Sequence, residues 1–143
     1  MPPSVVRVVD VYPYRYESDP PEFLLLRRAA GMDYAGQWRM VGGKIRPDEA
    51  AWETGLRELR EETGQDPTHF WALPSVNTFY EWREDRVNLV PAFAAELSDA
   101  PTLDDEHDDY AWYPAQEAVQ HLNWPEQQRL LRNGIPPSLI VDF

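Results

Sequence analysis

Residues 42–64, GGKIRPDEAAWETGLRELREETG, join a pair of glycines to a segment dense in glutamate. Pro47 is typical of the residues just before a helix, Asp48 is a candidate N-cap, and Gly64 is a candidate left-handed stop. The sequence therefore predicts a helix over residues 48–63. The rest of the chain is interpreted as scaffold, cover or substrate wall around this segment.

Two sets of side chains fall on different sides of the predicted helix, because residues three and four apart share a face. The set expected to pack is Trp52, Leu56, Leu59 and Thr63, and the acidic set is Glu58, Glu61 and Glu62. Like charges four residues apart destabilise a helix by about 0.2–0.5 kcal/mol, and carboxylates in the last turn oppose its dipole by about 0.3–1 kcal/mol. A pair between Arg57 and Glu61 offsets part of this cost. A bound Mg²⁺ or Mn²⁺ would reverse it, because both ions take oxygen ligands.

The spacing of this segment resembles the Nudix box, the signature of the Nudix hydrolase superfamily. Gly43 is followed after five residues by Glu49, and after seven more by RELREETG, residues 57–64, so the box covers residues 43–64. A glutamate pair alone is typical of a solvated helix face, but the number of matching positions argues against that alternative here. Three positions depart from the usual pattern: Arg46 stands for Glu, Asp48 for Gly and Gln65 for an apolar residue.

The resemblance implies an α/β fold of the α+β type, the Nudix fold, in which a mixed β-sheet is sandwiched between α-helices. It implies a single domain over residues 1–143 and a Mg²⁺ cofactor, with Mn²⁺ as a substitute. The metal ligands it implies are the carbonyl of Gly42 and the carboxylates of Glu58, Glu61, Glu62 and Glu106. Arg57 is expected to orient and neutralise the carboxylates, and Glu49 to brace the loop. Which glutamate acts as the general base is left open.

The assignment of Glu106 depends on a second resemblance. Glu106 and His107, a few residues ahead of Trp112, resemble a Glu-His pair of the Nudix subgroup that includes the dATP and dihydroneopterin triphosphate pyrophosphatases. In that subgroup the glutamate reaches the metals across the cleft. The acidic neighbours, Asp104, Asp105, Asp108 and Asp109, are interpreted as a solvated loop.

Composition limits the class of ligand. The net charge is −12, from 25 acidic and 13 basic residues, which argues against long nucleic acid because that binding depends on Lys and Arg. The absence of cysteine excludes disulfides and thiolate chemistry. The first residues lack the apolar core of a signal peptide, and no 18-residue apolar run follows. We therefore expect a soluble cytoplasmic protein with no membrane partner; a homodimer is left open.

Strand patterns flank the box on both sides. Strands are predicted over residues 4–16, 22–28, 38–41, 70–73, 75–82 and 87–97, with Pro91 marking an edge or bulge in the last. The continuous apolar run of residues 22–28 is typical of a strand covered on both faces. Helices are predicted over residues 114–122 and 125–133, the second with Gly134 as its stop. Gly55, costly inside a helix, suggests close packing against a strand.

Six residues are candidates for binding the substrate. Arg27 and Lys44 are placed to meet a phosphate, although ordinary surface charge is the alternative for both. Trp38, Phe79 and Tyr80, with Trp82, could stack on a nucleobase, although aromatics on strands more often pack in the core. The expected ligand is a small-molecule nucleotide.

These expectations combine into a hypothesis about activity. The chain is expected to be a magnesium-dependent pyrophosphohydrolase in which water attacks phosphorus of a nucleoside triphosphate, giving the monophosphate and pyrophosphate. The alternative substrates are a dinucleoside polyphosphate, ADP-ribose, or a capped or triphosphate RNA end. A Nudix-fold module that binds nucleotide without hydrolysis is a further alternative.

Overall fold

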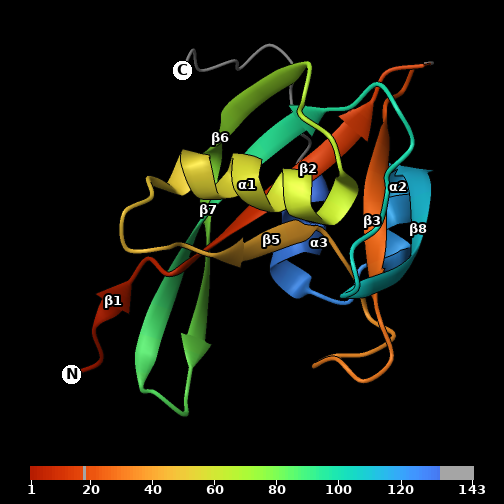
Figure 1. The fold of residues 1–143 in the computed structure, drawn as a ribbon. Coiled ribbons are helices and arrows are strands. Elements are labelled where there is room, and N and C mark those ends of the chain that lie inside the picture. The colour runs from red at the N-terminus through yellow and green to blue at the C-terminus, as the bar shows by residue number, and fades with distance from the viewer. Residues whose placement is uncertain (18, 133–143) are drawn as a thin grey trace.

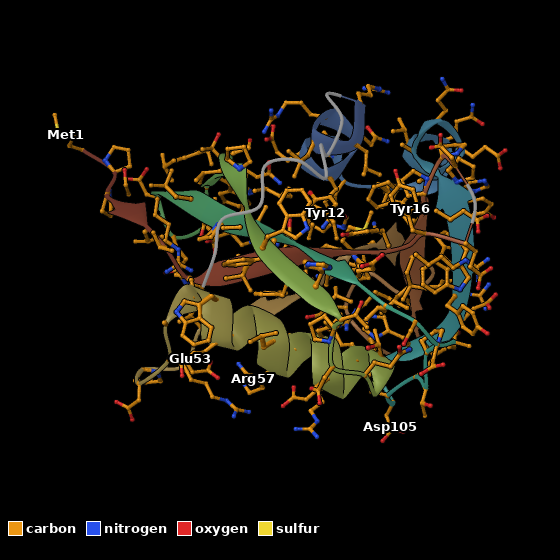
Figure 2. All side chains as sticks on the ribbon, turned by 90° about the horizontal axis from the view of Figure 1, so that it is seen from above. Met1, Tyr12, Tyr16, Glu53, Arg57 and Asp105 are labelled. Carbon is orange, nitrogen blue, oxygen red and sulfur yellow. The ribbon has the colours of Figure 1, made fainter. Side chains whose placement is uncertain are left out.

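A mixed sheet runs through the middle of the molecule and separates two helical layers. The computed structural model describes residues 1–17 and 19–132. The strands are β1 (Ser4–Val5), β2 (Val8–Arg15), β3 (Glu22–Arg28), β4 (Trp38–Arg39), β5 (Val41–Lys44), β6 (His69–Glu81), β7 (Arg86–Glu96) and β8 (His107–Pro114). The helices are α1 (Ala51–Thr63), α2 (Ala115–His121) and α3 (Pro125–Arg132). Helix α1 covers one face, and α2 and α3 cover the other (Figures 1 and 2).

Strand β2 is the centre of the sheet. It pairs parallel with β7 and antiparallel with β3 and β5. The β5 register sets Gly42 opposite Asp10 and Gly43 opposite Val9, which fixes the glycine pair beneath α1. Strand β7 continues the sheet to β6 and β1, and β3 continues it to β4 and β8. The predicted mixed sheet between helices is confirmed.

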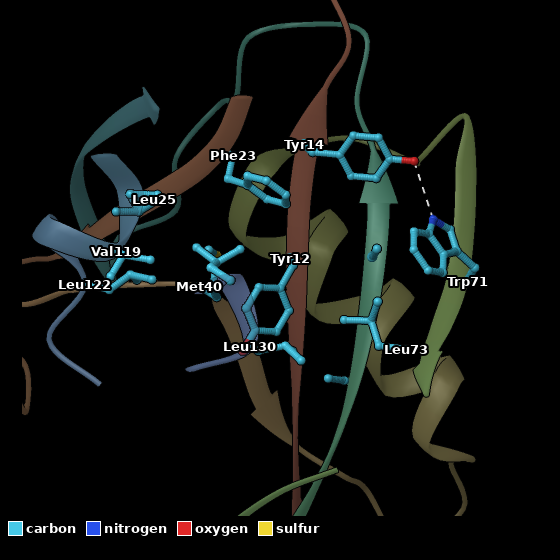
Figure 3. Packing of buried hydrophobic residues seen from close by; sticks show 14 residues of the cluster. Tyr12, Tyr14, Phe23, Leu25, Met40, Trp71, Leu73, Val119, Leu122 and Leu130 are labelled. Carbon is cyan, nitrogen blue, oxygen red and sulfur yellow. Dashed lines mark hydrogen bonds between the residues drawn. The ribbon is translucent and has the colours of Figure 1, made fainter. Parts of the chain in front are cut away.

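Alternation along β2 and β3 gives the sheet a packed core on each face. Val9 and Val11 point to the α1 side with Leu24, Leu26 and Leu59. The side of α2 and α3 receives Tyr12, Tyr14, Phe23 and Leu25, with Val119 and Leu130 from the helices (Figure 3). The Trp71 indole N–H donates to the Tyr14 hydroxyl at 3.4 Å, so the polar ends of two buried aromatics satisfy each other. The prediction that residues 22–28 are covered on both faces is confirmed.

Several predicted strand boundaries were wrong. The first strand is interrupted between Val5 and Val8, and the two aromatic runs form one strand, β6, whose register shifts between Ala72 and Val76. Pro91 pairs with Val76 at this shift, as its missing N–H suggested. The acidic segment was expected to be a loop, but from His107 it pairs with β3 as strand β8. Asp and Asn are rare in strands, so local propensity concealed this pairing.

Helix α3 begins at Pro125 as predicted, and its last described residue is Arg132. The predicted stop at Gly134 lies outside the described residues.

Gly55 lies in α1 where the helix meets the sheet. A Cβ atom at this position would lie 3.1 Å from Phe70 Cζ, 3.3 Å from Phe93 Cδ2 and 3.4 Å from Val11 Cγ2. The Phe70 and Phe93 rings stack at 5.2 Å between centroids. The close packing expected at Gly55 is confirmed, and it explains why a poor helix former stands there.

Gly55→Ala is expected to lower the free energy of unfolding by about 1 kcal/mol. Alanine gains about 1 kcal/mol of helix propensity, but crowding in a filled core costs about 1–3 kcal/mol. Urea unfolding in chelator measures the difference. In a Phe70→Leu background the same substitution should cost less. A Gly55→Ala protein more stable than wild type would contradict the account.

Candidate active site

Helix α1 starts later than its sequence indicated. Pro47 and Asp48 form a turn, and Ala50 is the N-cap. Glu53 accepts the Ala50 backbone N–H at 2.9 Å, which replaces the capping bond expected from Asp48. The predicted end is confirmed, because Gly64 adopts a left-handed φ of 73° and its N–H donates to the Arg60 carbonyl.

The face that α1 buries agrees with the predicted one at Leu59 and Thr63 and differs elsewhere. Its buried residues are Thr54, Gly55, Leu59, Glu62 and Thr63. Trp52 was expected to pack but is 42% exposed, whereas Glu62, a member of the acidic set, is buried. One glutamate of the helix, Glu62, therefore points into the molecule, toward β5.

Glu62 carries a buried carboxyl group that lies beside the carboxyl group of Glu58. Its side chain is only 4% exposed, and the Gly42 backbone N–H donates to its Oε2 at 3.3 Å. Burial raises the pKa of Glu62 well above its ordinary value, and the neighbouring Glu58 and Asp104 raise it further. Two carboxylates in such a position repel each other unless a proton or a cation lies between them.

Gly43 gives Glu58 its place against the sheet. A Cβ atom at Gly43 would overlap the Glu58 carboxyl group, so any side chain there would displace it. The bare backbone of β5 therefore allows Glu58 to lie beside Glu62. This is a physical reason for the glycine pair that starts the box.

Arg57 ties the acidic helix to the loop before it. Its guanidinium donates to Glu49 at 2.6 and 2.9 Å, to Glu58 at 2.8 Å, to Glu61 at 3.3 Å and to the Lys44 carbonyl at 3.0 Å. The Arg57 hydrogen bond lowers the pKa of Glu49 to about 2. Glu49 also accepts the Arg46 N–H and the Thr54 hydroxyl. These contacts suit the expected roles: Arg57 orients the carboxylates, and Glu49 braces the loop.

The carboxylates of the other two predicted metal ligands form ion pairs with arginines. Glu61 is 48% exposed and pairs with Arg57 and Arg46, while Glu106 is 53% exposed and pairs with Arg28 at 3.3 Å. Within residues 1–17 and 19–132, no three His, Cys, Asp or Glu side chains are arranged to hold a metal ion. The structure thus brings Glu58 and Glu62 together, while Glu61 shares the Arg57 Nη1 atom with Glu58 and Glu106 pairs with Arg28. The donor chemistry still fits a divalent cation, because the carboxylates of Glu58 and Glu62 are oxygen ligands of the hard type that Mg²⁺ takes.

Arg27 and Trp38 lie together on neighbouring strands. Arg27 pairs with Asp108 at 2.8 Å, and its guanidinium lies 5.8 Å from the centre of the Trp38 ring. Trp38 packs against the core cluster beside α2 and α3, and its backbone N–H donates to Asn123 at 2.8 Å. Both side chains therefore already have partners, and a nucleotide would have to compete for them.

Lys44 is exposed and borders a pocket of about 360 Å³ that also includes Arg7 and Arg46. Arg7 pairs with Glu81 at 3.8 Å and Arg46 with Glu61 at 3.7 Å. Two of the three cations thus have acidic partners.

Phe79 and Tyr80 lie away from the glutamate pair. Both belong to the exposed end of the β6–β7 hairpin, where the Tyr80 hydroxyl donates to Asp85. Strand β6 is three steps from β5 across β7 and β2, or about 14 Å at the usual strand spacing. The structure does not bring these two aromatics to Gly42. The prediction missed this because sequence position alone does not show on which arm of the sheet they lie.

Sequence reasoning assigned no role to two residues beside Glu62. Arg39 is close enough for the Glu62 charge to oppose the lowering of its pKa by burial. His107 is 5% exposed, and its Nε2 lies 3.5 Å from Glu62 Oε1. The Glu106–His107 pair was a signal for His107, whereas Arg39, on a two-residue strand, offered none.

Comparison with known proteins identifies the family. The NUDIX domain model matches residues 2–134, so the chain belongs to the NUDIX family. It is 33% identical over 112 residues to the CTP pyrophosphohydrolase of Escherichia coli (strain K12), covering 77% of this chain and 79% of that protein. It is 30% identical over 117 residues to the asymmetrical bis(5'-nucleosyl)-tetraphosphatase of Mus musculus, covering 79% of this chain and 78% of that protein.

A solved structure supports the fold. That of the E. coli dihydroneopterin triphosphate pyrophosphohydrolase has a TM-score of 0.75, covering 92% of this chain and 97% of that one. At 19% identity this likeness shows the fold alone. Among the described residues, no helix is long and apolar enough to span a bilayer.

Proposed function

We propose that this protein is a divalent-metal-dependent pyrophosphohydrolase that cleaves a nucleoside triphosphate into the monophosphate and pyrophosphate. The observation that carries the proposal is the pair of carboxyl groups, the buried one of Glu62 and the partly buried one of Glu58, held against the bare backbone of Gly42 and Gly43. Arg57 pairs with Glu58 at 2.8 Å, and a divalent cation between the two carboxylates would offset the burial and repulsion that raise the pKa of Glu62.

Each residue has a defined task in this proposal. Glu58 and Glu62 would hold the Mg²⁺, with Glu61, Glu106 and the Gly42 carbonyl as further oxygen donors. When bound, Mg²⁺ neutralises charge on the phosphoryl oxygens and lowers the pKa of water. One of the glutamates takes the proton of the attacking water.

The arginines surround this cluster. Arg57 keeps the Glu58 carboxylate oriented through its 2.8 Å hydrogen bond. Arg28 and Arg39 lie on the Glu106 and Glu62 sides of the cluster, where a guanidinium can meet a phosphoryl oxygen. Arg27 and Lys44 remain candidates for the outer phosphates, and Trp38 for the base.

The relatives support the class of bond more than the substrate. One is named for CTP and another for a bis-nucleosyl tetraphosphate. Both substrates contain phosphoanhydride bonds. We therefore take a nucleoside triphosphate as the first candidate and a dinucleoside polyphosphate as the second. The net charge of −12 disfavours long RNA, because a polyanion would meet repulsion along its length.

A panel of nucleotides assayed for products with Mg²⁺, and again with chelator, tests the proposal. We expect pyrophosphate and monophosphate from at least one triphosphate, and no turnover in chelator. Two mononucleotide products from a dinucleoside polyphosphate, without pyrophosphate release from triphosphates, would favour the second substrate. Calorimetric binding of nucleotide with no turnover in Mg²⁺ would instead indicate a binding module.

A further inference from the structure

The segment of residues 97–106 is fastened to the C-terminal end of α1. The Gln65 side-chain amide donates to the Asp99 carbonyl at 2.7 Å and accepts the Asp99 N–H at 3.3 Å. The Thr102 N–H donates to the Thr63 carbonyl at 2.8 Å. Asp105 accordingly lies beside this end of α1 in Figure 2. Gln65, which departs from the usual pattern of the box, thus has a structural task.

This docking brings a buried histidine to Glu62. The His107 side chain is 2% exposed and the Glu62 side chain 4%. His107 Nε2 lies 3.5 Å from Glu62 Oε1, and His107 Nδ1 lies 2.8 Å from Asp104 Oδ1. One imidazole ring therefore bridges two carboxyl groups, one from the loop and one from α1.

The two carboxylate oxygens of Glu62 thereby contact residues of two different strands. Oε2 accepts from the Gly42 N–H of β5, and Oε1 faces the His107 ring at the start of β8. Asp104 limits rotation of the ring, because its oxygen lies at hydrogen-bond distance from Nδ1. A long side chain with several rotatable bonds needs such contacts to stay in one orientation.

We propose that His107, fixed by Asp104, is a positioning residue that holds Glu62 in the orientation in which it binds a divalent cation. The inference rests on the proposed function only in taking Glu62 as a metal ligand. The ring nitrogen that would orient Glu62 is Nε2. Substitutions of His107 can keep a nitrogen at the place of Nε2 or at the place of Nδ1.

Binding of Mn²⁺ to the purified protein without substrate, followed by electron paramagnetic resonance, tests this. His107→Gln and His107→Asn form a matched pair: the glutamine amide nitrogen can take the place of Nε2, and the asparagine amide nitrogen that of Nδ1. We expect His107→Asn to weaken Mn²⁺ binding about 10–100-fold, the usual range for a residue that orients a metal ligand. His107→Gln should stay much closer to wild type. Thermal unfolding in chelator checks that both variants are folded.

Asp104→Ala is a second variant that leaves the histidine in place. We expect weaker Mn²⁺ binding here too, because the ring is free to turn away from Glu62. If His107→Asn and His107→Gln bind Mn²⁺ equally well, or lose it equally, the inference is wrong; if His107→Asn does not fold, unchanged Mn²⁺ binding by Asp104→Ala overturns it. Failure of the wild-type protein to bind Mn²⁺ would contradict the proposed function itself.

Discussion

Glu62→Gln is expected to lower kcat by about 10²–10⁴-fold while the protein stays folded. A metal ion stabilises the charge that develops in phosphoryl transfer by several kcal/mol. Each step of about 1.4 kcal/mol changes the rate about tenfold. Glutamine keeps the size of the side chain, and its carbonyl oxygen can still accept the Gly42 N–H. The loss would therefore come from the missing negative charge.

The stability of the same variant gives an independent check. Burial raises the pKa of Glu62, so the folded state favours its neutral form. The stability that this group contributes is present below its unfolded pKa and is lost as pH rises toward the folded value. In chelator at neutral pH, Glu62→Gln should thus unfold at the same temperature as wild type or a higher one. Steady-state kinetics and thermal melts measure both effects, with the exposed Glu117→Gln as control. A fully active Glu62→Gln would refute the assignment of this residue.

Glu106→Gln is expected to lower kcat by about 10²-fold or more. This glutamate is half exposed and pairs with Arg28, so its substitution should leave the stability of the fold almost unchanged. By resemblance its carboxylate reaches the metals, and a residue that binds metal or accepts a proton contributes at least about 10² in rate. Steady-state kinetics at saturating Mg²⁺ measures the effect.

Asp105→Asn is the matched control for this variant. Asp105 is the preceding exposed carboxylate of the same loop, so it should lose little activity. If Glu106→Gln keeps the wild-type rate, Glu106 belongs with its acidic neighbours as solvated surface.

Local patterns predicted the fold where one signal dominated. The apolar run of β3, the glycine at the end of α1 and the proline at the start of α3 each determine a structure within a few residues, and all three are confirmed. Strand β8 was missed because its first residues are polar and pair with β3 only through a contact distant in sequence. Long-range pairing of this kind leaves no local trace.

The candidate site was predictable in its residues more than in its geometry. Box spacing indicated Arg57, Glu58 and Glu62 as a group, and the structure places them together. Helical periodicity grouped Glu62 with Glu58 and Glu61 on one acidic arc, but it could not show that Glu62 is buried while Glu61 is half exposed. The bridge from Asp104 through His107 to Glu62 depends on how a loop docks on α1, which the sequence does not show.

Crystals soaked in millimolar Mn²⁺ test the central claim most directly, since anomalous scattering locates the ion without reference to activity. The account predicts an anomalous peak within coordination distance, about 2.0–2.4 Å, of oxygens of both Glu58 and Glu62. A map with no peak beside these two carboxylates, even with a non-hydrolysable nucleotide bound, would contradict it.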